Sequence, residues 1–175
     1  MKSDLEEFSF TAHSTPHEET RSQVGTAAPD FTLKNTGRDD ISLSGLRGKN
    51  VVLAFFPAAF TGVCEKELCT FRDSMSILNE LNATVLGISA DSPFANGAFS
   101  TKNELNFDIL SDYSRSAINA YDVALNDFAG MTGYTASQRA VFIVDVSGTI
   151  RYRWVGANPG IEPDYDEIKS ELAKL

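Results

Sequence analysis

The segment between residues 51 and 89 constrains the fold more than any other part of the chain. It begins with Val51–Phe56, a continuous apolar run rich in β-branched and aromatic residues, which predicts a strand buried on both faces. Apolar or thiol side chains then recur at steps of three and four residues from Cys64 to Leu81, which predicts one long helix. Thr84–Ser89 predicts a second strand. Because a strand, a helix and a strand in this order form a right-handed crossover between parallel strands, we expect an α/β fold.

Weaker patterns on both sides extend this unit. They predict hairpin strands at 28–33 and 41–43, a helix at 93–103, a strand at 108–110, a helix at 114–121, hairpin strands at 140–145 and 149–154, and a helix at 163–175. The last helix is expected to begin with Pro163 and to place Ile168, Leu172 and Leu175 on one face. No internal repeat or second-domain linker is present in the sequence.

The length of 175 residues fits one domain. Residues 1–22 are rich in Glu, Ser, Thr and His and have no sustained apolar period, which predicts a flexible N-terminal tail before a folded domain at 23–175. His13 and His17 are the only histidines, and both fall in this tail. The folded domain is therefore expected to work without a histidine base or metal ligand.

The charge and apolar patterns exclude several classes of protein. A formal net charge of −9 repels nucleic-acid phosphates and anionic lipid headgroups. No apolar stretch is long enough to span a bilayer, and the first residues lack the basic and apolar regions of a signal peptide. Two cysteines are too few for the disulfide framework of a small secreted domain. We therefore expect a cytoplasmic protein that binds neither nucleic acid nor membranes.

The first cysteine, Cys64, lies where the long helix is predicted to begin. Unpaired backbone N–H groups and the positive end of the helix dipole favour an anion at this position, and a thiolate is such an anion. Cys64 also belongs to the apolar stripe of the helix, and a cysteine there often serves only as a small core residue. Its position alone leaves both interpretations open.

The second cysteine, Cys69, points about 140° away from Cys64 around the helix axis and off the apolar stripe. Packing alone explains it poorly. The C-x4-C spacing differs from the C-x-x-C of dithiol exchange proteins and zinc knuckles, and no second pair of ligands completes a metal site. We therefore expect no metal.

The segment Pro57-Ala58-Ala59-Phe60-Thr61-Gly62-Val63-Cys64 resembles the P-x-x-x-T-x-x-C signature of the peroxiredoxins, the alkyl hydroperoxide reductase and thiol-specific antioxidant family. Further similarities follow in family order: Ala28–Phe31, Phe55-Phe56, Glu67 with Phe71–Asp73, and Arg139 before Ala140–Asp145. The resemblance covers about residues 24–175 and implies a thioredoxin-like fold, with a central mixed β-sheet flanked by helices.

The resemblance also implies roles for individual residues. Cys64 is the expected peroxidatic cysteine, with Thr61 as its hydroxyl partner and Arg139 as its cationic partner. Pro57 is expected to shield the sulfur, and the backbone N–H groups of Val63 and Cys64 to bind a peroxide oxygen. Glu67 is expected to orient an arginine, the alternative being a solvated carboxylate on the helix surface.

The expected reaction is reduction of hydrogen peroxide and alkyl hydroperoxides through a sulfenic acid, without metal or organic cofactor. The sequence mixes Q-type and E-type features, which leaves open whether Cys69 or an external thiol resolves the oxidised enzyme. Resolution by Cys69 and recycling by a thioredoxin-like reductant is the expectation, and a one-cysteine enzyme resolved by an external thiol is the alternative. A dithiol oxidoreductase and a redox sensor or chaperone remain as alternatives. A homodimer is compatible with the resemblance.

Overall fold

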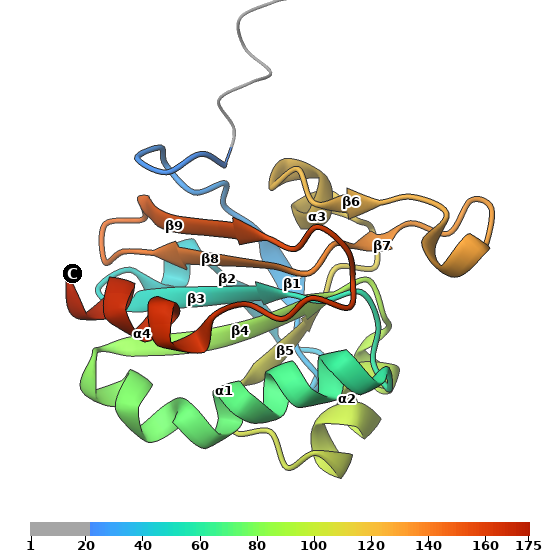
Figure 1. Ribbon diagram of the computed structural model, residues 1–175, viewed down its shortest axis with the longest axis horizontal. Coiled ribbons are helices and arrows are strands. Elements are labelled where there is room, and N and C mark those ends of the chain that lie inside the picture. The colour runs from blue at the N-terminus through green and yellow to red at the C-terminus, as the bar shows by residue number, and fades with distance from the viewer. Residues whose placement is uncertain (1–21) are drawn as a thin grey trace, which may run out of the picture.

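A mixed seven-stranded β-sheet forms the centre of the computed structural model, which describes residues 22–175. Its strands follow the order β2-β1-β5-β4-β3-β8-β9 (Figure 1). The neighbours β3, β4 and β5 are parallel, and every other pair is antiparallel. The strands are β1 (Thr32–Lys34), β2 (Asp40–Ser42), β3 (Asn50–Phe55), β4 (Ala83–Ser89), β5 (Asp108–Ser111), β8 (Ala140–Val144) and β9 (Ile150–Val155), with β6 (Ala124–Leu125) and β7 (Ala136–Ser137) in a separate ribbon.

Helices cover both faces of this sheet. They are α1 (Gly62–Glu80), α2 (Pro93–Lys102), α3 (Ser116–Ala120) and α4 (Tyr165–Ala173), with short 3₁₀ turns η1 (Ser44–Leu46) and η2 (Phe128–Gly130). In Figure 1, α1 and α4 lie in front of the sheet. The predicted parallel strand–helix–strand unit is confirmed, because β3 and β4 pair in parallel with Val52 opposite Val85, and α1 connects them.

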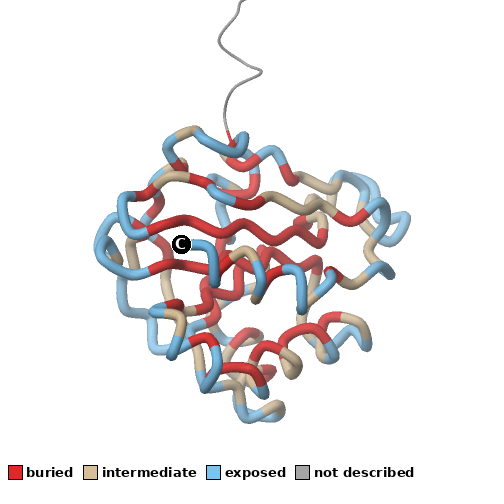
Figure 2. The backbone as a smooth tube through the Cα atoms, turned by 60° about the vertical axis from the view of Figure 1, so that its left-hand side comes forward, coloured by how far each residue is buried: buried red, intermediate tan, exposed pale blue. Residues whose placement is uncertain are grey.

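The two faces of the sheet bury separate apolar clusters. Along β3, Leu53 and Phe55 pack with α3 and the first hairpin, whereas Val52 and Ala54 pack with α1 and α4. Every residue of β3 is buried, as its continuous apolar run predicts. Figure 2 shows the buried residues concentrated along the strands and the inner sides of the helices. The α/β prediction, with a mixed sheet flanked by helices, is confirmed.

Both predicted hairpins are present, but two helices begin later than predicted. The N-cap of α4 is Asp164, whose carboxylate accepts hydrogen bonds from the amides of Asp166 and Glu167, so Pro163 precedes the helix instead of opening it. Leu175 follows the end of α4 and is 46% exposed. Helix α3 begins at Ser116 because the preceding residue, Arg115, has a left-handed backbone conformation.

At the N-terminal boundary, the predicted tail lies outside the described residues except for Ser22. The Ser22 side chain is buried, and its hydroxyl donates to the carbonyl of Tyr121. Ser22 therefore packs against the folded domain, and His13 and His17 lie outside the described residues.

The sheet register brings distant parts of the sequence to one end of β3. Phe55 at the end of β3 pairs with Ala140 at the start of β8, so Arg139 lies beside the point where the chain leaves the sheet toward α1. Parallel strands β3 and β4 also end at this edge. The loop that carries Cys64 and the cation predicted for it therefore meet here.

Candidate active site

The loop between β3 and α1 sets the position of Cys64. Pro57 follows Phe56 and is buried, and Phe60 has φ +61°, a left-handed conformation that is uncommon for a residue with a Cβ. Thr61 is the N-cap of α1, so Cys64 is the third residue of the helix. The first helical hydrogen bond joins the amide of Glu65 to the carbonyl of Thr61, so the helix itself does not use the amides of Gly62, Val63 and Cys64.

Cys64 is buried, with 1% of its surface exposed, and it contacts the guanidinium of Arg139. Arg139 Nη2 donates a hydrogen bond of 3.1 Å to Cys64 Sγ. A buried thiol that faces a guanidinium differs from a cysteine that only fills a core, because the cation stabilises the sulfur as a thiolate. Of the two interpretations of Cys64, this geometry favours the reactive one.

Two groups besides the Cys64 thiol hold Arg139 in place. Its Nη1 is paired with Glu67 Oε2, while its Nε and Nη2 donate to the Pro159 carbonyl at 3.0 and 2.9 Å. Although burial opposes the charged form, Glu67 and Cys64 raise the pKa of Arg139 above its ordinary value. The guanidinium is therefore a fixed positive charge in the site.

Glu67 is fully buried, which excludes the alternative of a solvated helix-surface carboxylate. Burial raises the pKa of Glu67 to about 7, against the opposing effect of the neighbouring Arg139. Its Oε1 has no hydrogen-bond partner among the described residues. The carboxyl group therefore lies in a dry environment, where its main interaction is with the arginine that contacts Cys64.

The hydroxyl of Thr61 is oriented by the loop. Thr61 Oγ1 donates to the Ala58 carbonyl at 2.9 Å, and the side chain does not cap the helix. Because its proton is used in this bond, the oxygen presents its lone pairs to an incoming group. Thr61 is therefore prepared to act as a hydrogen-bond acceptor.

A cavity of about 240 Å³ opens beside these groups. Its walls are formed by Pro57, Thr61, Gly62, Val63, Phe128, Arg139, Pro159 and Gly160. The helix start, the hydroxyl and the guanidinium are thus gathered around one space. The volume suits a small substrate, and the Phe128 ring and the proline rings supply apolar contacts.

Cys69 lies outside this cavity. It is half-buried, and its thiol lies 3.6 Å from Asn103 Oδ1 at the end of α2. Both cysteines are free thiols, and α1 is continuous between them. Five residues on an intact helix span about 7.5 Å along its axis, which exceeds the usual Cα separation in a disulfide. Cys64 and Cys69 therefore cannot be bridged in this conformation.

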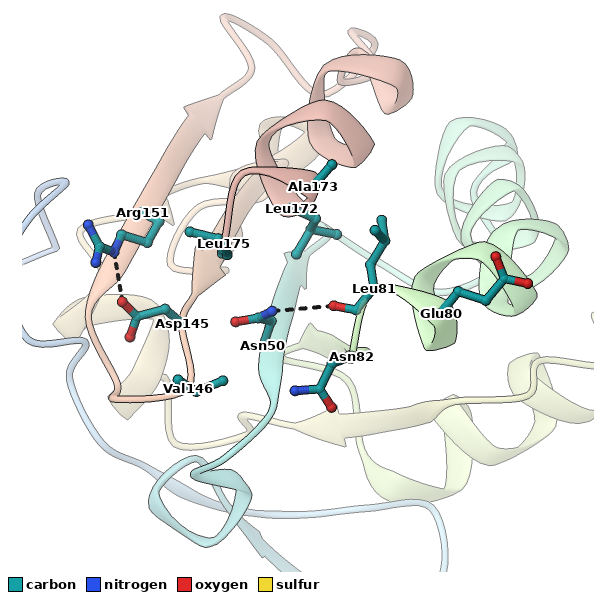
Figure 3. Close-up of a pocket in the computed structure, with 10 residues that line it drawn as sticks. All are labelled: Asn50, Glu80, Leu81, Asn82, Asp145, Val146, Arg151, Leu172, Ala173 and Leu175. Atoms are coloured by element: carbon teal, nitrogen blue, oxygen red, sulfur yellow. Dashed lines mark hydrogen bonds and ion pairs between the residues drawn. The ribbon is translucent and has the colours of Figure 1, made fainter.

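A larger cavity of about 460 Å³ lies at the opposite end of β3, beside Asn50 (Figure 3). None of its lining residues carries a thiol or hydroxyl group. Its guanidinium, from Arg151, is already paired with Asp145 at 2.7 Å. The smaller cavity beside Cys64 is therefore the better candidate for chemistry.

Two contributions to the site were not predicted from the sequence. One is the Pro159 carbonyl that holds Arg139. The other is Asp91, whose Oδ2 accepts a hydrogen bond of 2.8 Å from the Ala59 amide and so anchors the loop before α1. Asp91 lies two residues beyond the end of the parallel strand β4, where polar residues often serve a site, and that position was the available signal.

Residues 22–175 contain neither a metal-ligand cluster nor a membrane-spanning helix. No group of three or more histidine, cysteine, aspartate or glutamate side chains in this range could hold a metal ion. No helix in the same range has the length and apolar character needed to cross a membrane.

Comparisons with known proteins give a matching family model, similar sequences and a similar structure. The model of the AhpC/TSA family matches residues 24–153. The chain is 37% identical over 131 residues to alkyl hydroperoxide reductase E of Mycobacterium tuberculosis, covering 74% of this chain and 82% of that protein. It is 35% identical over 133 residues to peroxiredoxin Bcp of Bacillus subtilis, covering 75% and 84%. The crystal structure of peroxidoxin BcpB from Mycobacterium tuberculosis superposes with a TM-score of 0.77 and 25% identity, covering 87% and 97%.

Proposed function

This chain belongs to the AhpC/TSA family and is a thiol-dependent peroxidase with a thioredoxin-like fold, and we propose that Cys64 is its peroxidatic cysteine. The single observation that carries this assignment is the 3.1 Å contact between Arg139 Nη2 and the buried Cys64 Sγ. The Cys69 thiol instead lies 3.6 Å from an amide oxygen, Asn103 Oδ1. The fixed charge and the helix N-terminus together support a thiolate at Cys64.

The reaction begins when the Cys64 thiolate attacks the terminal oxygen of a hydroperoxide. A sulfur–oxygen bond forms and the oxygen–oxygen bond breaks, so Cys64 becomes a sulfenic acid and the peroxide leaves as hydroxide or alkoxide. The leaving oxygen takes a proton from solvent to give water or an alcohol. The peroxide is thereby reduced by two electrons and the sulfur is oxidised by two.

The surrounding groups align the peroxide. Arg139 supplies positive charge beside the sulfur, where negative charge moves from sulfur to the leaving oxygen. Thr61 Oγ1 accepts a hydrogen bond from the protonated peroxide oxygen, and the amides of Val63 and Cys64 donate to the peroxide. Pro57 limits access of water to the sulfur, and Glu67 orients Arg139. Hydrogen peroxide and small alkyl hydroperoxides are the substrates that suit a cavity of about 240 Å³.

Cys69 is the proposed resolving cysteine. Its thiol attacks the sulfenic sulfur, a disulfide forms, and the sulfenic oxygen leaves as water. Because the intact helix separates the two thiols, the first turns of α1 must open before this step. A thioredoxin-like dithiol then reduces the disulfide by exchange and is itself oxidised. We also propose that the chain assembles as a homodimer.

The proposal is tested by measuring peroxide consumption with a dithiol reductant in excess. Cys64→Ser should abolish turnover and leave the circular dichroism spectrum unchanged, because a serine hydroxyl without an adjacent base is a poor nucleophile. Cys69→Ser should react once with peroxide and then accumulate as the sulfenic acid. Turnover that persists in Cys64→Ser contradicts the assignment, whereas normal turnover of Cys69→Ser points to resolution by an external thiol.

A further inference from the structure

The end of α2 packs against the first turns of α1. Lys102 Nζ lies 3.0 Å from Glu65 Oε1, and Asn103 Nδ2 donates to the same oxygen at 3.4 Å. Glu65 directly follows Cys64 in the sequence. Two neighbouring residues of one helix end therefore hold the helical turn that contains the reactive thiol.

The same helix end also holds the loop before Cys64. The Phe60 ring packs edge-to-face on Phe99 of α2, with ring centroids 5.4 Å apart. Lys102 Nζ lies 5.6 Å from the centroid of the Phe60 ring, within the range of a cation–π contact. Lys102 thus contacts the chain both before and after Cys64.

Asn103 connects this contact to the second cysteine. Its Oδ1 lies 3.6 Å from Cys69 Sγ, and its backbone carbonyl accepts from Arg72 Nη1 at 2.5 Å. One asparagine therefore contacts the turn after Cys64, the Cys69 thiol and the turn that follows it. Any opening of α1 that lets Cys69 approach Cys64 must first separate these contacts.

We propose that Lys102 and Asn103 are positioning residues for the resolving step, and that their release from α1 limits how fast the sulfenic acid at Cys64 reaches Cys69. This inference rests on the proposed function of Cys69. In the step concerned, the Cys69 sulfur bonds to the Cys64 sulfur, the sulfur–oxygen bond breaks, and the hydroxyl group leaves with the thiol proton as water.

The contact between α1 and the end of α2 also affects how readily excess peroxide inactivates the protein. While α1 stays closed, a second hydroperoxide can oxidise the sulfenic acid to a sulfinic acid and leave as water or alcohol. Disulfide formation competes with this reaction only after the helix opens. Weakening the contact between α1 and α2 should therefore speed disulfide formation and protect Cys64 from over-oxidation.

The test compares Lys102→Ala and Asn103→Ala with wild type in single-turnover experiments with one equivalent of hydrogen peroxide. Quenched-flow mass spectrometry follows the sulfenic acid and then the disulfide. Disulfide formation should be about two- to fivefold faster in Lys102→Ala than in wild type, as expected for loss of a partly exposed ion pair. In Asn103→Ala it should be at least as fast as in Lys102→Ala. The rate of sulfenic acid formation should stay within about twofold of wild type, because neither side chain contacts the sulfur or the cavity.

Matched variants separate this effect from general destabilisation. Lys174→Ala removes a lysine of similar exposure, 64% against 60%, that pairs with Glu171 within α4, and it should leave both rates unchanged. Lys102→Arg should restore the wild-type rate, because arginine can pair with Glu65 and lie over Phe60. Equal disulfide rates in wild type and both alanine variants overturn the inference alone. If wild type forms no disulfide at all, the proposed role of Cys69 fails and the inference fails with it.

Discussion

At the residue scale, the chemistry depends on how Arg139 is held. Its guanidinium contacts a thiol, a carboxylate and a carbonyl, and the side chain is 1% exposed. A free arginine side chain has several flexible bonds, so each of these contacts reduces the entropy that must be lost when a transition state forms. Glu67 and the Pro159 carbonyl therefore contribute to catalysis through the arginine, without contacting the peroxide.

Replacing Arg139 alone would leave Glu67 as an unpaired buried charge, which costs about 3–5 kcal/mol of stability. The double variant Arg139→Ala/Glu67→Gln removes both charges together. Its second-order rate with peroxide, measured by stopped flow, should fall at least about tenfold, corresponding to about 1.4 kcal/mol of lost charge-assisted interaction. Glu67→Gln alone should lose much less, because the amide oxygen still accepts from Arg139. An unchanged rate in the double variant would mean that another group activates the sulfur.

The Thr61 hydroxyl is expected to contribute to the rate by accepting a hydrogen bond from the peroxide. Thr61→Val keeps the shape of the side chain and removes the oxygen that faces the cavity, so the rate with peroxide should fall about tenfold for the loss of one aligned hydrogen bond. Thr61→Ser keeps the hydroxyl and should retain most of the rate. If both variants react equally, the hydroxyl does not align the peroxide.

At the element scale, the hairpin of β8 and β9 depends on one carboxylate. Asp145 Oδ1 accepts from Ser147 N, Ser147 Oγ and Thr149 N, and its Oδ2 accepts from Arg151 Nε. Although burial acts to raise it, these donors hold the pKa of Asp145 well below its ordinary value of 3.8. The folded state therefore favours the ionised form more strongly than the unfolded state does.

The pH dependence of stability follows from the lowered pKa of Asp145. The stabilisation is fully present above about pH 4 and is lost as the pH falls from there through the folded-state pKa. Asp145→Ala should lower the free energy of unfolding by about 1.5–3 kcal/mol at pH 7, measured by urea denaturation. The difference between variant and wild type should shrink at pH 3. A constant difference across this range would show that the ionised carboxylate is not the cause.

The elements that the sequence predicts well are those fixed by local patterns. The β3–α1–β4 unit follows from a continuous apolar run and a helical period, and both hairpins follow from alternation around turn residues. The start of α4 was wrong because the Asp164 side chain caps the helix more effectively than Pro163 opens it. The short strands β6 and β7 have no periodic signal of their own.

The candidate site is harder to predict from sequence patterns than the helices and strands are, because its residues come from segments that are far apart in the sequence. Cys64 and Arg139 are 75 positions apart, and their juxtaposition was expected only from the family resemblance. The roles of Pro159 and Asn103 depend on a backbone carbonyl and a helix end, which carry no residue-type signature in the sequence. Only the folded arrangement reveals them.

At the scale of the whole molecule, oxidation should change stability as well as chemistry. In the reduced protein, α1 buries Leu68, which contributes about 1.5–3 kcal/mol, and it holds Glu67 against Arg139, a pair whose disruption costs about 3–5 kcal/mol. A disulfide between Cys64 and Cys69 requires the first turns of this helix to open. It closes a loop of about six residues, which stabilises the chain by only roughly 2 kcal/mol.

We therefore predict that the disulfide form is less stable than the reduced form, although it contains an additional covalent bond. For a domain of this size, each kcal/mol corresponds to about 2–4 °C in Tm, so the Tm of the oxidised protein should be lower by at least about 4 °C in differential scanning calorimetry. Cys69→Ser treated with one equivalent of peroxide is the control, because its helix stays closed and its Tm should match that of the untreated variant. Amide exchange should increase across residues 60–72 in the disulfide form alone. A Tm that is equal or higher after disulfide formation would mean that the two cysteines join without opening α1, which the continuous helix from Gly62 to Glu80 argues against.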